Sequence, residues 1–258
     1  MYNPCAFFSG QRPLSLSRLE IPASLRIAVA APHPDDFDAI AITMRWFQKN
    51  GNEIELAVLT SGSSGVEDGF AGARTPDAKR QVREAEQRAS CELFGLDPTR
   101  LEFLRLSEDS EAHPLANVDN LATVRTFLLR VRPDIIFLPH GKDTNVAHQR
   151  THEFVTGVVE KERLSVLLCL NEDPKSLNIR RDLTVWFSES DAGWKARLLR
   201  LHASQHERNL RTRGRGFDER ILSMNRRAAV ESGSSALYAE AFELACYERG
   251  RLEPDGSC

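Results

Sequence analysis

The chain has 258 residues, of which 41% are hydrophobic and 28% charged, and its net charge at pH 7 is -3. This composition is typical of one or two globular domains, and the small net charge excludes a general electrostatic attraction to nucleic acid or to an anionic membrane. No apolar run reaches the roughly 20 residues that span a bilayer. No basic segment followed by an apolar core opens the chain, so we expect a cytoplasmic protein without a secretory signal.

Periodic apolar patterns divide the chain into alternating strands and helices. Residues 1–24 show no clear period and are expected to form an N-terminal extension that packs on a single domain at 25–248, with a flexible tail at 249–258. The expected strands cover residues 25–31, 53–60, 101–106, 135–139, 165–170 and 183–187. The expected helices cover residues 39–49, 75–94, 118–131, the segment ending at 159, 192–213 and 236–247.

This alternation predicts an α/β fold, Rossmann-like, with a mostly parallel sheet and helices on both faces. The glycine-rich phosphate loop that would follow the first strand of a nucleotide-binding Rossmann enzyme is absent, so no dinucleotide site is expected.

The cysteines are scattered along the chain and show no CxxC spacing. Their odd number and their spacing predict reduced thiols, and neither a disulfide framework nor a cysteine zinc site. The five are Cys5, Cys91, Cys169, Cys246 and Cys258.

A first candidate site follows the strand expected at 25–31, where His33, Asp35 and Asp36 precede a helix. Ligands of open α/β sheets bind at the carboxyl ends of the strands, and an imidazole beside carboxylates is typical of a metal site. Neighbouring side chains point apart, so one aspartate would bind the ion while the other acts as a base. A turn with an N-cap aspartate explains the same residues.

A second group, His140, Asp143 and His148, follows the strand expected at 135–139, and His152 lies one helical turn further on. If both strands lie in the middle of one sheet, the two groups converge above its carboxyl edge. Three ligands drawn from histidine and aspartate, with one open position, are typical of a catalytic zinc site. We expect His152 to support the ligands without binding the ion.

The order of these motifs resembles the PIG-L/LmbE family of zinc-dependent N-deacetylases over about residues 25–245. The matching segments are Pro32-His33-Pro34-Asp35-Asp36, Arg83-x-x-Glu86, Asp143-Thr144-Asn145-x-x-His148, Lys195 with His202-x-Ser204-Gln205, and Tyr238-Ala239-Glu240-x-Phe242. The resemblance implies that His33, Asp36 and His148 bind one zinc ion per chain, although iron, cobalt or nickel also suits such a site. It also implies that Asp35 is the general base.

The resemblance further places Arg83 and Asp109 at positions that contact the sugar of the substrate. Lys142 and Asn145 are candidates for stabilising the oxyanion, together with the metal. Within the metal motif Ala147 replaces an aspartate that commonly precedes the histidine ligand in the family. The basic run at 208–215 either meets an anionic substrate group or forms a solvated or intersubunit surface.

The expected function is removal of an N-acetyl group from an amino-sugar-containing small molecule by a metal-dependent hydrolase. Two alternatives stay open: hydrolysis of another N-acyl or carbamoyl group in secondary metabolism, and ligand binding without catalysis. The expected partner is the small-molecule substrate, with no nucleic acid and no membrane span, and assembly into a homo-oligomer stays open.

Overall fold

The computed structural model describes residues 3–233 and 235–254. Within these residues one sheet contains β1 (Leu14–Ser15), β2 (Arg26–Ala31), β3 (Glu53–Val58), β4 (Leu101–Phe103), β5 (Ile135–Pro139), β6 (Val166–Asn171), β7 (Leu183–Phe187), β8 (Tyr238–Glu248) and β9 (Arg251–Leu252). The helices are α1 (Asp36–Ala39), α2 (Ala41–Lys49), α3 (Pro76–Phe94), α4 (Val118–Val131), α5 (Val146–Lys161), α6 (Glu189–Leu201), α7 (Ala203–Arg213) and α8 (Phe217–Glu231).

The order of the strands creates a natural ligand site. The sheet runs β1-β7-β8-β6-β5-β2-β3-β4, and β9 pairs with β8. Strands β4, β3, β2, β5 and β6 are parallel, whereas β8 is antiparallel to both β6 and β7. The chain adds β3 and β4 on one side of β2 and then places β5 on its other side. The carboxyl ends of β2 and β5 are therefore a topological switch point, where open α/β sheets bind ligands.

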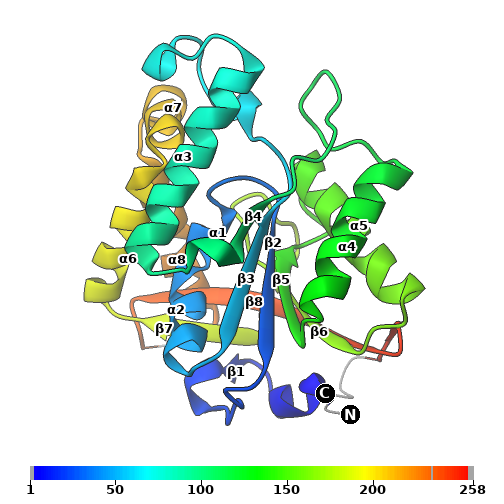
Figure 1. The fold of residues 1–258 in the computed structure, drawn as a ribbon. Helices are drawn as coiled ribbons and strands as arrows, with labels where there is room; N and C mark the ends of the chain where they lie inside the picture. Colours follow the sequence, from blue (N-terminus) through cyan, green and yellow to red (C-terminus); the bar gives the residue numbers. More distant parts are fainter. Residues whose placement is uncertain (1–2, 234, 255–258) are drawn as a thin grey trace.

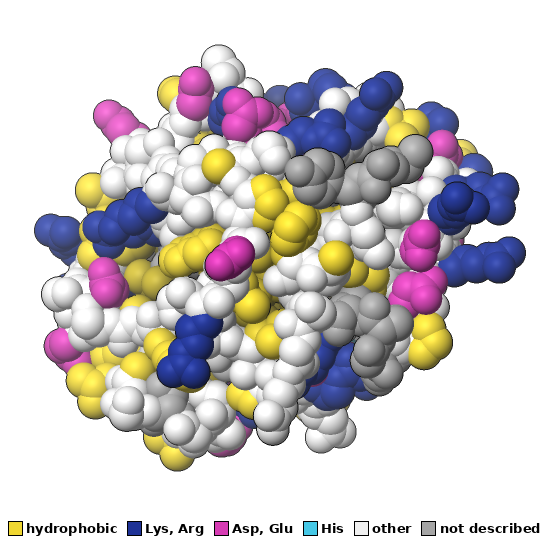
Figure 2. Space-filling model, turned by 90° about the horizontal axis from the view of Figure 1, so that it is seen from below, with side chains coloured by type: hydrophobic (Ala, Val, Ile, Leu, Met, Phe, Trp, Pro, Cys, Tyr) yellow, Lys and Arg dark blue, Asp and Glu magenta, His cyan; other side chains and the backbone are white. Residues whose placement is uncertain are grey.

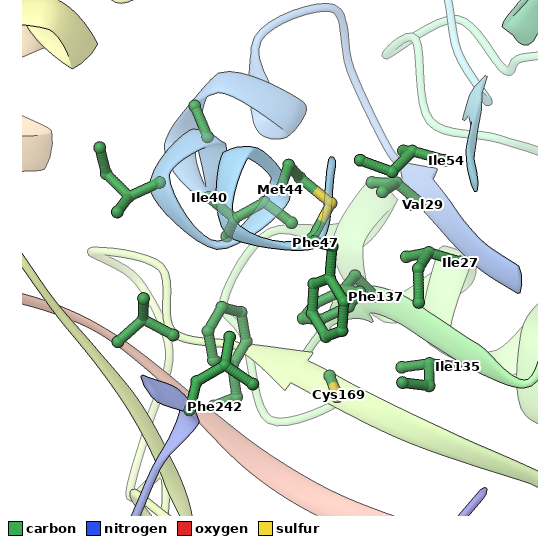
Figure 3. Packing of buried hydrophobic residues seen from close by; sticks show 14 of the residues in the cluster. Ile27, Val29, Ile40, Met44, Phe47, Ile54, Ile135, Phe137, Cys169 and Phe242 are labelled. Carbon is green, nitrogen blue, oxygen red and sulfur yellow. The ribbon is translucent and has the colours of Figure 1, made fainter. Parts of the chain in front are cut away.

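Helices cover both faces of the sheet, as the alternating pattern predicts. Figure 1 shows α2, α3 and α6 on one side of the central strands and α4 with α5 on the other. Successive residues of β5 enter different layers: Ile135 and Phe137 pack in one apolar cluster, and Ile136 and Leu138 in the other. Figure 3 shows the first layer, in which the Phe137 ring lies 5.7 Å from Phe47. This two-sided burial explains the unbroken apolar run of β5.

Several elements have the expected bounds. The helix at 118–131 and the strands at 135–139 and 183–187 are confirmed residue for residue. Helix α3 begins after Thr75, whose side chain accepts the Ala78 N–H, and ends at Gly95 in the left-handed conformation. Two helices expected to be continuous are broken, one at Ile40 and one at His202.

The helix expected at 236–247 is wrong, because this segment forms strand β8. Both faces of β8 are covered: Ala239 and Ala241 pack with residues of α8, while Phe242 and Leu244 enter the main cluster. A strand buried on both sides lacks the apolar–polar alternation that would distinguish it from a helix. Helix α8 was not expected at all, although its buried Phe217, Ile221, Met224 and Ala228 recur at helical spacing.

The expectation of reduced thiols is also wrong for one pair, since Cys5 and Cys246 form a disulfide. Their separation of 241 residues hides the pairing in the sequence. The pair forms because the turn containing Cys5 packs under the sheet, where both sulfur atoms lie in the main apolar cluster. Cys91 and Cys169 are free and buried, and Cys258 lies outside the described residues.

The two ends of the described chain join the sheet at its lower part in Figure 1. Residues 14–15 pair with β7, and residues 251–252 pair with β8. Of the tail expected at 249–258, positions 255–258 lie outside the described residues. The face seen from below carries a discontinuous patch of hydrophobic side chains (Figure 2), at the end opposite the switch point. No helix among the described residues is long and apolar enough to cross a membrane.

Candidate metal and acyl-transfer site

The turn between β2 and α1 presents the first group of candidate residues. Asp36 begins α1, and Asp35 precedes it with φ +135°, a backbone conformation that is costly for any residue but glycine. The Asp35 N–H donates to Gln87 Oε1 of α3 at 3.0 Å, which helps to hold this conformation. The His33 N–H donates to the Asp36 carboxylate at 2.8 Å, so both side chains are fixed on one side of the turn.

His33, Asp36 and His148 form a group with the geometry of a metal site. Each offers one ligand atom, and these atoms lie within 4.8 Å of one another. The Nδ1 atom of His33 lies 3.3 Å from one carboxylate oxygen of Asp36, and Nε2 of His148 lies 3.7 Å from the other. Burial acts to raise the pKa of Asp36, but the charge of His148 and the hydrogen bonds from His33 outweigh it and lower the pKa to about 2. Two imidazoles and an ionised carboxylate are a donor set that suits zinc.

Two further carboxylates, Asp143 and Asp173, lie beside His148. Its Nδ1 lies 3.2 Å from Asp143 Oδ2, which orients the ring so that Nε2 faces Asp36. Asp173, just beyond β6, lies in the same acidic group. Burial acts to lower the pKa of His148, but Asp36 and Asp143 raise it to about 9. The carboxylates therefore favour a positive charge at this place, and a carboxylate behind a ligand histidine is the usual support of a metal site.

Asp35 is held by a buried ion pair. Arg83 Nη2 lies 3.0 Å from its carboxylate and also donates to the Pro34 carbonyl, while Nη1 lies 3.4 Å from Glu86. Glu86 in turn accepts the N–H and hydroxyl of Ser204, each at 2.7 Å. Burial raises the pKa of Asp35 and Arg83 opposes the rise. Both charged residues of this α3 pair are buried, Arg83 being 1% exposed and Glu86 9%.

Asp38 belongs to a buried network behind the turn. Its carboxylate accepts hydrogen bonds from Gln87 and Ser90 of α3, and Nε2 of His202 lies 2.7 Å from it. Gln87 is the same side chain that binds the Asp35 backbone. His202 is fully buried and does not line the pocket. It therefore acts at a distance from the site, through Asp38.

A pocket of about 390 Å³ opens beside the metal group. One wall comes from the β2–α1 turn and the start of α5, with His33, Asp35, Asp36, Asn145 and His148. A second part of the lining comes from α7 and α8, with Arg208, Asn209, Arg213, Phe217 and Arg220. The small-residue loop at 61–65 also contributes, through Gly62, Ser64 and Gly65.

The remaining predicted site residues do not all reach this pocket. Asn145 lines it and caps α5: its Oδ1 accepts the Ala147 N–H at 3.0 Å, which leaves Nδ2 as its donor. Asp109 is not a lining residue, and its carboxylate accepts the N–H groups of Glu111 and His113. Lys142 is exposed and does not line the pocket either.

Two groups of pocket residues were not predicted from the sequence. Asp173 and Lys175 follow the carboxyl end of β6, so the rule that located His33 and His148 would have found them too. Arg220 lies on α8, the helix that was not expected.

The other histidines have structural surroundings. His140 is buried, with Nε2 3.2 Å from Glu243, and its ring stacks on that of His152 at 6.5 Å. Neither lines the pocket, and the supporting role of His152 stays a prediction. His113 lines the pocket from the 111–113 loop, whereas His206 lies 3.2 Å from Asp218 outside it.

Solved structures show where this fold occurs. An N,N'-diacetylchitobiose deacetylase from Pyrococcus horikoshii is 17% identical, with a TM-score of 0.70 over 88% of this chain and 85% of that one. A 4-carboxy-2-hydroxymuconate hydratase from Pseudomonas putida KT2440 is 18% identical, with a TM-score of 0.66 over 86% and 95%. The zinc-inhibited form of a teicoplanin deacetylase is 12% identical, with a TM-score of 0.64 over 89% and 99%.

A comparison with curated protein sequences gives no significant match. The family model described as GlcNAc-PI de-N-acetylase, PIG-L, matches residues 28–159, just over half of the chain. This range includes both strand ends that carry the metal group. The motifs, the fold and the family model agree, and the chain belongs to the PIG-L family.

Proposed function

We propose that the protein is a metal-dependent N-deacetylase that removes the acetyl group from an amino-sugar-containing small molecule, with zinc as the first candidate metal. The observation that carries the proposal is the pair of groups at the switch point: a three-donor metal group, and a separate aspartate beside it that no metal geometry requires. Membership of a family described as de-N-acetylases supports the choice of reaction.

We propose that His33, Asp36 and His148 hold the metal. A zinc ion bound there would polarise the acyl carbonyl and lower the pKa of a water molecule. Asp143 orients His148, and its buried carboxylate adds negative charge that favours a bound cation.

Asp35 is proposed as the general base. It is adjacent to Asp36 in the chain and lines the pocket, and its ion pair with Arg83 holds the carboxylate in one orientation. It would take the proton of the attacking water and return it to the leaving amine. Arg83 would thus act through Asp35 as well as at the sugar position that its motif implies.

Asn145 is proposed to stabilise the oxyanion through its Nδ2 group, because its Oδ1 is already used as a helix cap. Lys142 and Asp109 keep their proposed contacts with substrate only if the substrate extends beyond the pocket lining. The proposal therefore rests least on these two residues.

The test is acetate release from a panel of N-acetylglucosamine conjugates, measured with zinc, cobalt, nickel or iron(II) added to metal-free protein. Including several metals is necessary because one structural relative is the zinc-inhibited form of a deacetylase. The Asp35→Asn variant is expected to keep its metal and lose about 100-fold or more of kcat. The matched control is Asp119→Asn, an exposed aspartate in the first turn of α4.

Full turnover by Asp35→Asn with its metal in place would remove Asp35 from the role of base. Failure to release acetate from any conjugate with any of the metals would overturn the deacetylase proposal. In that case water addition would be the next reaction to measure, because one structural relative is a hydratase.

A further inference from the structure

We propose that the wall formed by α7 and α8 binds an anionic group of the substrate, a carboxylate or a phosphate, through Arg213 and Arg220. The inference rests on the proposed function in one respect: it takes the metal group as the end of the pocket where the acyl group reacts. It adds the chemical class of the substrate, which the metal group alone does not define.

The first observation is that these two arginines have no protein partner. Within residues 3–233 and 235–254, neither Arg213 nor Arg220 forms an ion pair or a side-chain hydrogen bond. Other arginines of the same region are paired: Arg200 lies 2.7 Å from Asp218, and Arg208 lies 3.9 Å from Glu67. A guanidinium group that lines a pocket without a carboxylate partner is available to a ligand.

The second observation is the environment of Arg220. Its side chain is half-buried, and both burial and the nearby charges of Arg213 and Arg215 lower its pKa. Asp173 and Asp35 act in the opposite sense, but neither forms an ion pair with it. Arg213 and Arg220 both line the pocket and repel each other, and an anion bound beside them would relieve this repulsion.

The third observation is the charge balance of the pocket. Its lining contains the cations Arg83, Lys175, Arg208, Arg213 and Arg220 and the carboxylates Asp35, Asp36, Glu111 and Asp173. Three of these carboxylates, Asp35, Asp36 and Asp173, lie in or beside the metal group, where a divalent cation would compensate two charges. Arg83 and Arg208 are already paired with Glu86 and Glu67, so the lining arginines that remain for an anion are Arg213 and Arg220.

Guanidinium groups favour planar or tetrahedral oxyanions, because their N–H groups form paired hydrogen bonds with carboxylate or phosphate oxygens. The pocket volume of about 390 Å³ accommodates a sugar-sized ligand that contacts both the metal group and the residues of α7 and α8. The best substrates should therefore combine an N-acyl amino group with a carboxylate or a phosphate.

The experiment compares three probes on metal-loaded protein: N-acetylglucosamine, N-acetylglucosamine 6-phosphate and N-acetylmuramic acid, which carries a carboxylate. Binding is measured by calorimetry, and kcat/KM by acetate release, for wild type, Arg213→Gln and Arg220→Gln. The control is Arg197→Gln, which removes an exposed arginine of α6 that does not line the pocket.

We expect at least one anionic probe to bind more tightly than the neutral sugar, and Arg220→Gln to weaken that binding about 10- to 100-fold. The affinity of Arg220→Gln for the neutral sugar should differ from that of the wild type by less than about threefold. The control variant Arg197→Gln should bind every probe within the same range. Preference for the phosphate or for the carboxylate identifies which anion the wall accepts.

Equal binding of neutral and anionic probes by the wild type would overturn the inference, as would an equal loss of both in Arg220→Gln. The binding measurement decides this even if no probe releases acetate. Failure of the proposed reaction and failure of the anion site are therefore separate results.

Discussion

Replacing Lys195 by methionine tests whether a buried ion pair joins the helices that surround the site. The Lys195 side chain is 0% exposed, and its Nζ donates to Glu240 Oε1 at 2.6 Å, to Asn225 Oδ1 at 2.9 Å and to the Ala39 carbonyl at 2.5 Å. One ammonium group therefore links α6, α8, β8 and the end of α1. Burial lowers the pKa of Lys195, and Glu240 opposes that effect.

The expected loss in the free energy of unfolding follows from the buried groups that remain in Lys195→Met. Glu240 would remain buried, holding hydrogen bonds only from the N–H groups of Ile42 and Thr43 and from the Thr43 hydroxyl. Removing one partner of a buried ion pair costs about 3 to 5 kcal/mol, because the other charge is left uncompensated. Replacing both partners with uncharged side chains costs much less, so Lys195→Met/Glu240→Gln should recover at least about 2 kcal/mol.

The assay is urea unfolding of the four members of this double-mutant cycle, followed by circular dichroism at pH 7. The isosteric Glu240→Gln variant alone is the matched control for loss of the opposite charge. A loss of less than about 1 kcal/mol in Lys195→Met, or no recovery in the double variant, would refute the view that the pair is needed as a unit.

Three further changes probe other parts of the fold. Burial acts to raise the pKa of Glu243, but His140, whose Nε2 lies 3.2 Å away, and the Arg180 N–H help to lower it to about 2. Solvent screens part of this interaction, so Glu243→Gln should reduce the free energy of unfolding by about 1 to 2 kcal/mol at pH 7. That difference should shrink as the pH falls from 4.5 towards 2, and a pH-independent difference would contradict the assignment. Cys5→Ser removes a disulfide that closes a loop of 241 residues, so it should lower the free energy of unfolding by about 3 to 5 kcal/mol. If dithiothreitol does not change the stability of the wild type, that result argues against the bond. Gly62 has φ +60°, and a Cβ there would lie 3.0 Å from the Pro34 ring, so Gly62→Ala should destabilise the protein by about 1 to 2 kcal/mol in thermal unfolding; unchanged stability would show that the loop can move.

The fold was largely predictable where burial leaves a clear period. The unbroken run at 135–139 and the amphipathic helix at 118–131 have their expected bounds. The segment at 236–247 was not predictable in this way, because β8 has 11 residues, the length of a helix, and burial on both faces removes the alternation that would identify a strand. The Cys5–Cys246 pairing depends on how the N-terminal segment packs against β8, which no local pattern encodes.

The candidate site also contains residues that could be predicted from the sequence and residues that could not. The strand-end rule located the two groups that contain His33, Asp36 and His148, and the family resemblance selected these three. The structure brings their ligand atoms together. Arg220 could not, because its place in the pocket depends on the packing of α7 and α8. The burial of Arg83 and Glu86 could not be predicted either, because it depends on the packing of α3 against the β2–α1 turn.

The most direct test of the account is the metal content of the purified protein after reconstitution with zinc, measured for wild type, His148→Ala and His152→Ala. Both histidines lie on α5, one turn apart, but only His148 belongs to the donor group. The account predicts about one metal ion per chain in wild type and in His152→Ala, and loss of that ion in His148→Ala. Metal retained by His148→Ala, or none bound by wild type, would contradict it and leave His33, Asp35 and Asp36 as a turn and a helix cap.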